Sequence, residues 1–179
     1  MPFEFEEKEI KGVVLVKPRV FDDSRGFFLE TYEKSSFEKA GIKMNIIQSN
    51  HSYSKKGVLR GLHFQKGEYA QAKLVKCIKG EIFDVAVDIR KDSNTFGKYV
   101  SAILSEDNKN MLYIPRGFAH GFLVLSDSAE VLYNVDNFYK KDAEGGLIWN
   151  DPDVNIKWPA KDVILSDKDE LLPKLDGLK

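Results

Sequence analysis

The sequence predicts an all-β protein, either a sandwich or a barrel, with a few short helices. Short β-rich runs follow one another closely, with Gly, Asp and Asn turns between them. The chain has neither a long amphipathic helix nor a regular strand–helix repeat, which argues against doubly wound and (β/α)₈ architectures. Its 179 residues are the size of one ordinary domain, so we expect residues 1–179 to form a single domain.

Strands are expected where β-branched and aromatic residues gather between turn residues. The expected strands are Val13–Val16, Phe27–Tyr32, Ile46–His51, Val58–Gln65, Lys73–Ile78, Glu81–Ile89, Tyr99–Leu104, Met111–Ile114, Phe118–Leu125 and Ala129–Asn137. Lys79–Gly80 predicts a hairpin turn. After this turn the odd-numbered residues 83–89 are apolar, which predicts a strand with a single buried side.

Two short helices are expected. Ser35–Gly41 begins with a hydroxyl residue that can cap the helix N-terminus and ends with a glycine that can close its C-terminus. In the polar tail, Ser166 stands before an acidic turn that leads into Leu171 and Leu172, which predicts a second capped helix.

Composition narrows the partners and the location. The chain has 27 basic and 28 acidic residues, so it lacks the positive charge of a general nucleic-acid binder. No apolar run approaches the ~20 residues that cross a bilayer, and no secretory pattern opens the sequence. Cys77 is the only cysteine and suits a small apolar core position. We expect a cytoplasmic protein with no membrane or nucleic-acid partner.

The histidines His51, His63 and His120 are candidates for chemistry, although a single histidine is more often structural. His63 lies in an apolar strand beside a cation and an amide. On strand alternation, His120 shares its face with Phe118 and Phe122 and should point into a lined interior. Its polar edge then needs a partner, from the protein or from a ligand.

A catalytic metal is not expected. Metal sites in barrels need three or four converging ligands, and His-x-His is the usual start. Gln65 stands two residues after His63, where that pattern needs a second histidine, and Glu68 is the one nearby carboxylate.

Two further polar residues should face the interior. Lys73 heads a strand with an apolar stripe, so it is either a solvated strand end or a fixed cation in a cavity. Tyr133 alternates with Val131 and Val135, a position that is most often structural.

Together these residues belong to motifs that resemble the dTDP-4-dehydrorhamnose 3,5-epimerase family. The likeness covers nearly the whole chain, in order and without a large insertion. The matching segments are 23–28, 60–65, 73–75, 80–90, 114–122 and 149–152.

The resemblance implies a cupin-type jelly-roll β-barrel that forms a homodimer. It also implies inversion of C3 and C5 of a 4-keto-6-deoxyhexose on dTDP, on the route to dTDP-L-rhamnose, without a cofactor. Within this family His63 would be the base, oriented by Asp169. Lys73 would stabilise the enolate, and Tyr133 would be the acid on the opposite face.

The resemblance further assigns substrate contacts. Tyr139 matches an aromatic residue that stacks on thymine, and Ser49 departs from the aspartate typical of the family. The matched contact positions are Arg25, Glu30, Gln48, Ser49, Asn50, Arg60, His120, Tyr139, Glu144 and Lys168. Arg60 and His63 are three residues apart, so an unbroken strand would send them to opposite faces unless a bulge at Gly61 realigns them.

Three alternatives to this activity stay open. One is an epimerase that acts at one carbon only or on a sugar carried by another nucleotide. A second is a cupin that binds a carbohydrate without turnover, and a metal-dependent cupin is the weakest of the three.

Overall fold

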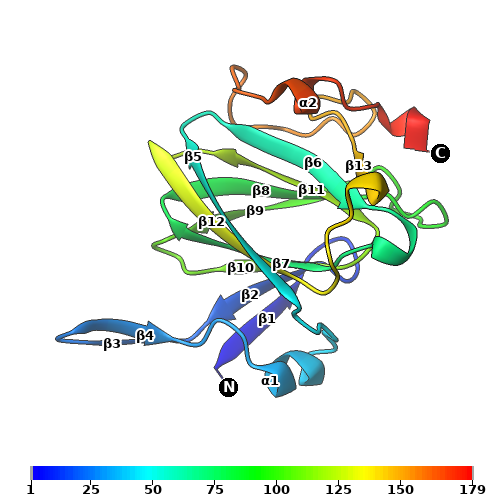
Figure 1. Cartoon of the computed structure of the whole chain (residues 1–179). Coiled ribbons are helices and arrows are strands. Elements are labelled where there is room, and N and C mark those ends of the chain that lie inside the picture. Colours follow the sequence, from blue (N-terminus) through cyan, green and yellow to red (C-terminus); the bar gives the residue numbers. More distant parts are fainter. Residues whose placement is uncertain (1, 179) are drawn as a thin grey trace.

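The computed structural model describes residues 2–178, and most of its secondary structure is β-strand (Figure 1). The strands are β1 Phe3–Glu7, β2 Val14–Pro18, β3 Val20–Asp23, β4 Gly26–Leu29, β5 Gln48–Lys55, β6 Leu59–Gln65, β7 Lys73–Lys79, β8 Glu81–Asp88, β9 Tyr99–Ser105, β10 Met111–Ile114, β11 Phe118–Val124, β12 Ser128–Val135 and β13 Glu144–Gly146. The helices are α1 Lys34–Lys39, α2 Asp167–Glu170 and the 3₁₀ turns Gly67–Tyr69, Lys141–Ala143 and Leu175–Leu178. No helix among these residues is long and apolar enough to span a membrane.

Two antiparallel sheets face each other as a jelly roll. One has the order β1-β2-β10-β7-β12-β5 and the other β13-β6-β11-β8-β9. The main core fills the space between them, with buried residues from both sheets such as Val75, Cys77, Ala86 and Phe122. The expected all-β class and its jelly-roll form are confirmed.

Two smaller cores lie outside the barrel. Phe37 of α1 packs with Phe3 and Leu74 on the outer side of the six-stranded sheet. On the outer side of the five-stranded sheet, Val85 and Leu147 are buried with residues of the C-terminal segment, which crosses this sheet (Figure 1).

This covering corrects the prediction of a single buried side for β8. Val85 and Val87 are buried outside the barrel, while Ile82 and Ala86 are buried inside it. The alternating pattern identified a strand but not its surroundings, because the C-terminal segment that covers the second face is distant in sequence.

The first helix has a different cap, two residues earlier in the sequence than expected. Glu33 is the N-cap of α1, and its carboxylate accepts hydrogen bonds from the backbone N–H groups of Ser35 and Ser36. Ser35 therefore lies inside the helix, whereas the expectation had it at the cap. In α2, Ser166 is the N-cap as predicted, and its hydroxyl accepts from the backbone N–H of Asp169.

Strands β3 and β4 form a hairpin that projects away from the barrel (Figure 1). The sequence predicted a strand over Phe27–Tyr32, but β4 begins at Gly26 and ends at Leu29. Strand β1 was missed, although Phe3 and Phe5 alternate there with glutamates.

Candidate active site

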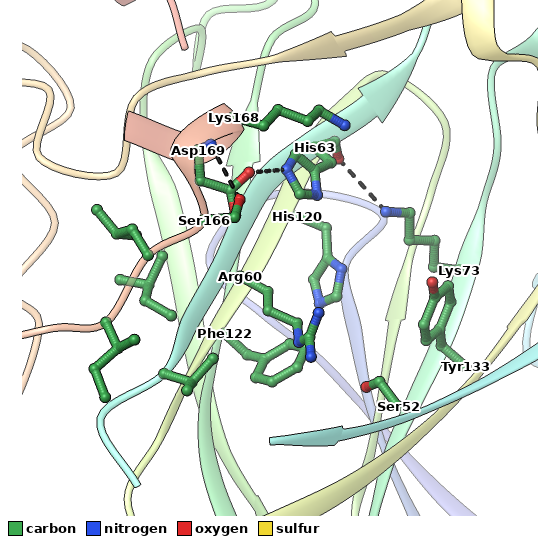
Figure 2. Close-up of a pocket in the computed structure, with 14 residues that line it drawn as sticks. Ser52, Arg60, His63, Lys73, His120, Phe122, Tyr133, Ser166, Lys168 and Asp169 are labelled. Carbon is green, nitrogen blue, oxygen red and sulfur yellow. Dashed lines mark hydrogen bonds and ion pairs between the residues drawn. The ribbon is translucent and has the colours of Figure 1, made fainter. Parts of the chain in front are cut away.

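A cavity of about 430 Å³ opens between the two sheets (Figure 2). A pocket of about 300 Å³ adjoins it. Both are lined by His63, Lys73 and Tyr133. The larger cavity also contains Arg60, His120, Lys168 and Asp169, and the smaller one contains Gln48, Asn50, Tyr139 and Glu144.

His63 and Asp169 form a close pair at the wall of the cavity. The Nε2 atom of His63 lies 2.6 Å from Oδ1 of Asp169, although 106 residues separate them in sequence. Asp169 has 5% of its side-chain surface exposed, against 30% for His63. Burial alone would raise the pKa of Asp169, but the hydrogen bond and charge of His63 lower it below its usual value. An ionised Asp169 accepts the Nε2–H, which leaves Nδ1 of a neutral His63 free to accept a proton.

Lys73 extends from β7 toward the same space. Its ammonium is 3.5 Å from the backbone oxygen of His63 and 6.0 Å from the ring centre of Tyr133. Burial lowers the pKa of Lys73 to about 8, so the ammonium form still prevails at neutral pH. Figure 2 shows this side chain between the backbone of His63 and the phenol of Tyr133.

Tyr133 faces the interior from β12, as its alternation predicted, and packs against the main core. Burial raises the pKa of its phenol, while Arg60 opposes that rise. The phenol therefore keeps its proton at neutral pH, as a proton donor must.

His120 is paired with a residue that the sequence reasoning missed. Its Nε2 atom lies 2.8 Å from Oδ1 of Asp84, and the side chains are 7% and 0% exposed. Burial lowers the pKa of His120, although Asp84 opposes the fall. A carboxylate between Ile82 and Ala86 in an inward-facing stripe is a signal that could have been read from the sequence.

The spacing of Arg60 and His63 is resolved by a break in the pairing of β6 with β11. His63 pairs with His120 and Arg60 with Phe122, and the register shifts between these two pairs. Gly61 lies at this point with φ +121, and a Cβ atom there would come within 2.5 Å of the Gly121 Cα. A glycine is needed for both reasons. Both side chains consequently line the cavity.

The contact residues at the pocket rim form a network. The hydroxyl of Tyr139 donates to Glu144 at 3.1 Å, and Glu144 also pairs with Lys168. The backbone N–H of Tyr139 donates to Gln48 at 3.2 Å, and Gln48 donates to Asn50 at 2.9 Å.

Three expected contact residues are not brought to the cavity of their own chain. Arg25 lies at the tip of the β3–β4 hairpin, 87% exposed, and pairs with Asp23. Glu30 follows β4 at the base of the hairpin. Ser49 is exposed on the side of β5 opposite to Gln48.

No three His, Cys, Asp or Glu side chains within residues 2–178 are grouped closely enough to hold a metal ion. The histidines of the cavity instead form separate pairs with one aspartate each. These pairs are suited to orienting imidazoles and moving protons.

A jelly-roll barrel whose polar cavity is lined by imidazole, ammonium and phenol groups has the architecture of a cupin-type epimerase. The model of the dTDP-4-dehydrorhamnose 3,5-epimerase family matches residues 7–177. The chain belongs to this family, as its motifs predicted.

Relatives agree over nearly the full length. A dTDP-4-dehydrorhamnose 3,5-epimerase from Shigella flexneri is 57% identical over 162 residues, which are 90% of each chain. The crystal structure of the enzyme of that name from Elizabethkingia anophelis superposes with a TM-score of 0.95 at 46% identity, covering 99% of this chain and 98% of the other. A dTDP-6-deoxy-D-glucose-3,5-epimerase from Legionella pneumophila, in complex with dTDP-4-keto-L-rhamnose, gives 0.94 at 42% identity and covers 97% and 93%.

Proposed function

We propose that the chain, as one domain, inverts C3 and C5 of dTDP-4-dehydro-6-deoxy-D-glucose to give dTDP-4-dehydro-L-rhamnose. A hydrogen beside a ketone can be removed only where the resulting enolate is stabilised. The reaction then needs a base, a cation near the ketone oxygen and an acid that returns the proton from the opposite face. Family membership and the naming of the full-length relatives support this activity.

One observation carries the proposal: a buried carboxylate holds the His63 imidazole at 2.6 Å on the wall of a cavity that Tyr133 also lines. Asp169 fixes the ring and stabilises its protonated form, so His63 is suited to be the base. The Lys73 ammonium provides positive charge for the enolate, and Tyr133 supplies the returning proton. No cofactor enters these steps.

The rim residues fit the nucleotide part of the substrate. In this proposal Tyr139, 52% exposed, stacks on the thymine ring. Arg60 and Lys168 contact the diphosphate, and the amides of Gln48 and Asn50 complete the pocket. A relative with 42% identity holds dTDP-4-keto-L-rhamnose, which supports a ligand of this kind.

We further propose a homodimer in which the β3–β4 hairpin reaches the other copy. The hairpin exposes Phe21, Phe27 and Phe28 by 46%, 57% and 66%, and a partner surface would cover them. Arg25 and Glu30 would then serve the partner's cavity, since neither residue lines the pockets of its own chain. Light scattering should give the mass of two chains at micromolar concentration, and a monomeric mass in the active protein would contradict this assembly.

The proposed location is the cytoplasm. Its reducing environment is compatible with the free thiol of Cys77, and sugar-nucleotide substrates are available there. The nucleotide sugar is the proposed partner. Nucleic acids and membranes are not, in keeping with the net charge of -1.

The activity can be tested with dTDP-4-keto-6-deoxyglucose in heavy water, followed by NMR at each carbon. Deuterium at both C3 and C5, with formation of the L-configured product, is the expected result. Label at one carbon would indicate a monoepimerase, and no label would indicate a carbohydrate-binding protein. Both outcomes would overturn the proposal. A loss of activity with a chelator that a metal ion restores would contradict the cofactor-free reaction.

Tyr133→Phe separates proton removal from inversion. The variant lacks the proposed acid but keeps His63, so label should still enter from solvent while net inversion falls ~10³-fold. The measurement compares deuterium uptake with product formation in one sample. Tyr53→Phe, at an exposed tyrosine of β5 that lines neither pocket, is the matched control and should behave as wild type. An unchanged inversion rate in Tyr133→Phe would remove this residue from the mechanism.

A further inference from the structure

A second buried carboxylate, Asp84, lies inside the barrel and has no part in the mechanism above. It stands on β8 between Ile82 and Ala86, which face the main core, and its side chain is fully buried. A carboxylate in such a place is costly to keep ionised unless partners compensate for the lost water. The contacts of the Asp84 carboxylate therefore indicate its role in the protein.

Only one oxygen of Asp84 has a hydrogen-bond partner among residues 2–178. Oδ1 accepts from Nε2 of His120 at 2.8 Å, whereas Oδ2 is buried and unpaired. For a neutral His120, a proton on Nε2 leaves Nδ1 as an acceptor. His120 lines the cavity, so this arrangement prepares it to receive a hydrogen bond from a substrate hydroxyl.

The charge of Asp84 also acts on Lys73. Burial lowers the pKa of Lys73 to about 8, and Asp84 is the stronger of two carboxylates that oppose this fall, ahead of Glu144. The titratable groups that share the two pockets with Lys73 are His63 on β6, His120 on β11, Tyr133 on β12, Tyr139, Glu144 on β13, and Lys168 and Asp169 on α2, with Arg60 as a permanent cation.

Asp88, four residues further along the same strand and equally buried, provides the contrast. Its oxygens accept hydrogen bonds from Arg90, Ser93 and Thr95, none of which lines either pocket of the site. Burial would raise the pKa of Asp88, but these partners lower it to about 2. Asp88 is fully satisfied by its own neighbourhood, whereas Asp84 is not.

We propose that Asp84 is a positioning residue of the epimerase: its carboxylate fixes the His120 ring as an acceptor in the cavity, and its buried charge supports the ammonium of Lys73, which lines the same cavity. This inference rests on the proposed function for its effect on the reaction. Asp84 lines neither pocket, so it acts through these two side chains.

The first test is the pH dependence of solvent exchange in Asp84→Asn. Removal of the negative charge lowers the pKa of Lys73, so the ammonium is lost at a lower pH. The alkaline limb of the rate should move down by about one pH unit, with roughly a fivefold loss at pH 8 and little loss at pH 6.5. Asp88→Asn is the matched control, because it neutralises a buried aspartate of the same strand and should leave the limb in place. An alkaline limb that stays in place in Asp84→Asn would overturn the proposal, as would an equal shift in both variants.

The second test needs no substrate. Nitrogen-15 NMR of the wild-type protein should show His120 neutral with its proton on Nε2, and the Lys73 titration should move to lower pH in Asp84→Asn. A proton on Nδ1 in wild type, or an unmoved Lys73 titration in the variant, would overturn the proposal. The His120 measurement decides the matter even where the variant fails to fold. If the wild-type protein shows no exchange on the sugar nucleotide, the proposed function fails. The two NMR measurements still test the effect of Asp84 on His120 and Lys73, because they need no substrate.

Discussion

The barrel contains two histidine–aspartate pairs of nearly equal length but opposite surroundings. His63 and Asp169 are 2.6 Å apart, and His120 and Asp84 are 2.8 Å apart. In the first pair the imidazole is 30% exposed, so it can exchange protons with a bound molecule. In the second it is 7% exposed and burial lowers its pKa, so it holds a fixed, neutral form.

A short contact between histidine and aspartate therefore does not itself make a base. The exposure of the imidazole distinguishes a pair that is suited to moving protons from one that is suited to holding a shape. The substitutions below test this distinction.

His63→Ala should have the largest effect. Solvent exchange into the sugar should fall by ~10⁴-fold, because the other paired imidazole of the cavity, His120, is 7% exposed and does not take the place of His63. The exchange rate in heavy water, measured by NMR, checks this. His51→Ala is the control, since His51 is half exposed on β5, pairs with Glu130 and lines neither pocket. Equal exchange in His63→Ala and wild type would remove the distinction between the two pairs.

Asp169→Asn should weaken exchange by ~10²-fold while the protein stays folded. The amide keeps the shape of the side chain but loses the charge that orients the ring and stabilises its protonated form. Steady-state exchange rates and a circular dichroism spectrum measure the two properties. Asp167→Asn, in the same helix but exposed, should match wild type. Equal losses in the two variants would show that helix stability, and not the histidine contact, explains the effect.

Ser166→Ala should have the smallest effect. Its hydroxyl accepts the backbone N–H of Asp169 at 3.2 Å, so its loss frays the start of α2. We expect about 1 kcal/mol or less in the free energy of unfolding and a few-fold loss of activity. Denaturant unfolding and exchange assays measure these effects. Ser166→Asp, which restores a capping oxygen, should recover both, and a failure to recover would argue against the cap.

Much of the fold was predictable because its signals are local. Strand alternation placed Tyr133 and His120 inside the barrel, and the hairpin at Lys79–Gly80 joins β7 to β8 as expected. The second buried face of β8 was not predictable, since a segment remote in sequence creates it. Glu33 replaced the expected serine at the cap of α1 because a carboxylate can accept two backbone N–H groups at once.

The site was less accessible to local reasoning. The strand patterns predicted that Lys73 and Tyr133 face the interior. Their roles in the reaction came from the family resemblance and stay proposals. Asp84 was missed because the apolar alternation of β8 identifies its outward face, which carries Val85 and Val87. Asp84 belongs to the other face of the strand. The reach of Arg25 depends on a hairpin that leaves the barrel, which strand periodicity does not describe.

Asp169 is supplied from α2, 106 residues after His63 in the sequence, and every strand of both sheets precedes it. A barrel can therefore assemble while His63 still lacks its carboxylate, and the pair is completed only when the segment that carries α2 docks against the five-stranded sheet. A loosened α2 should silence the site before the strands themselves unfold.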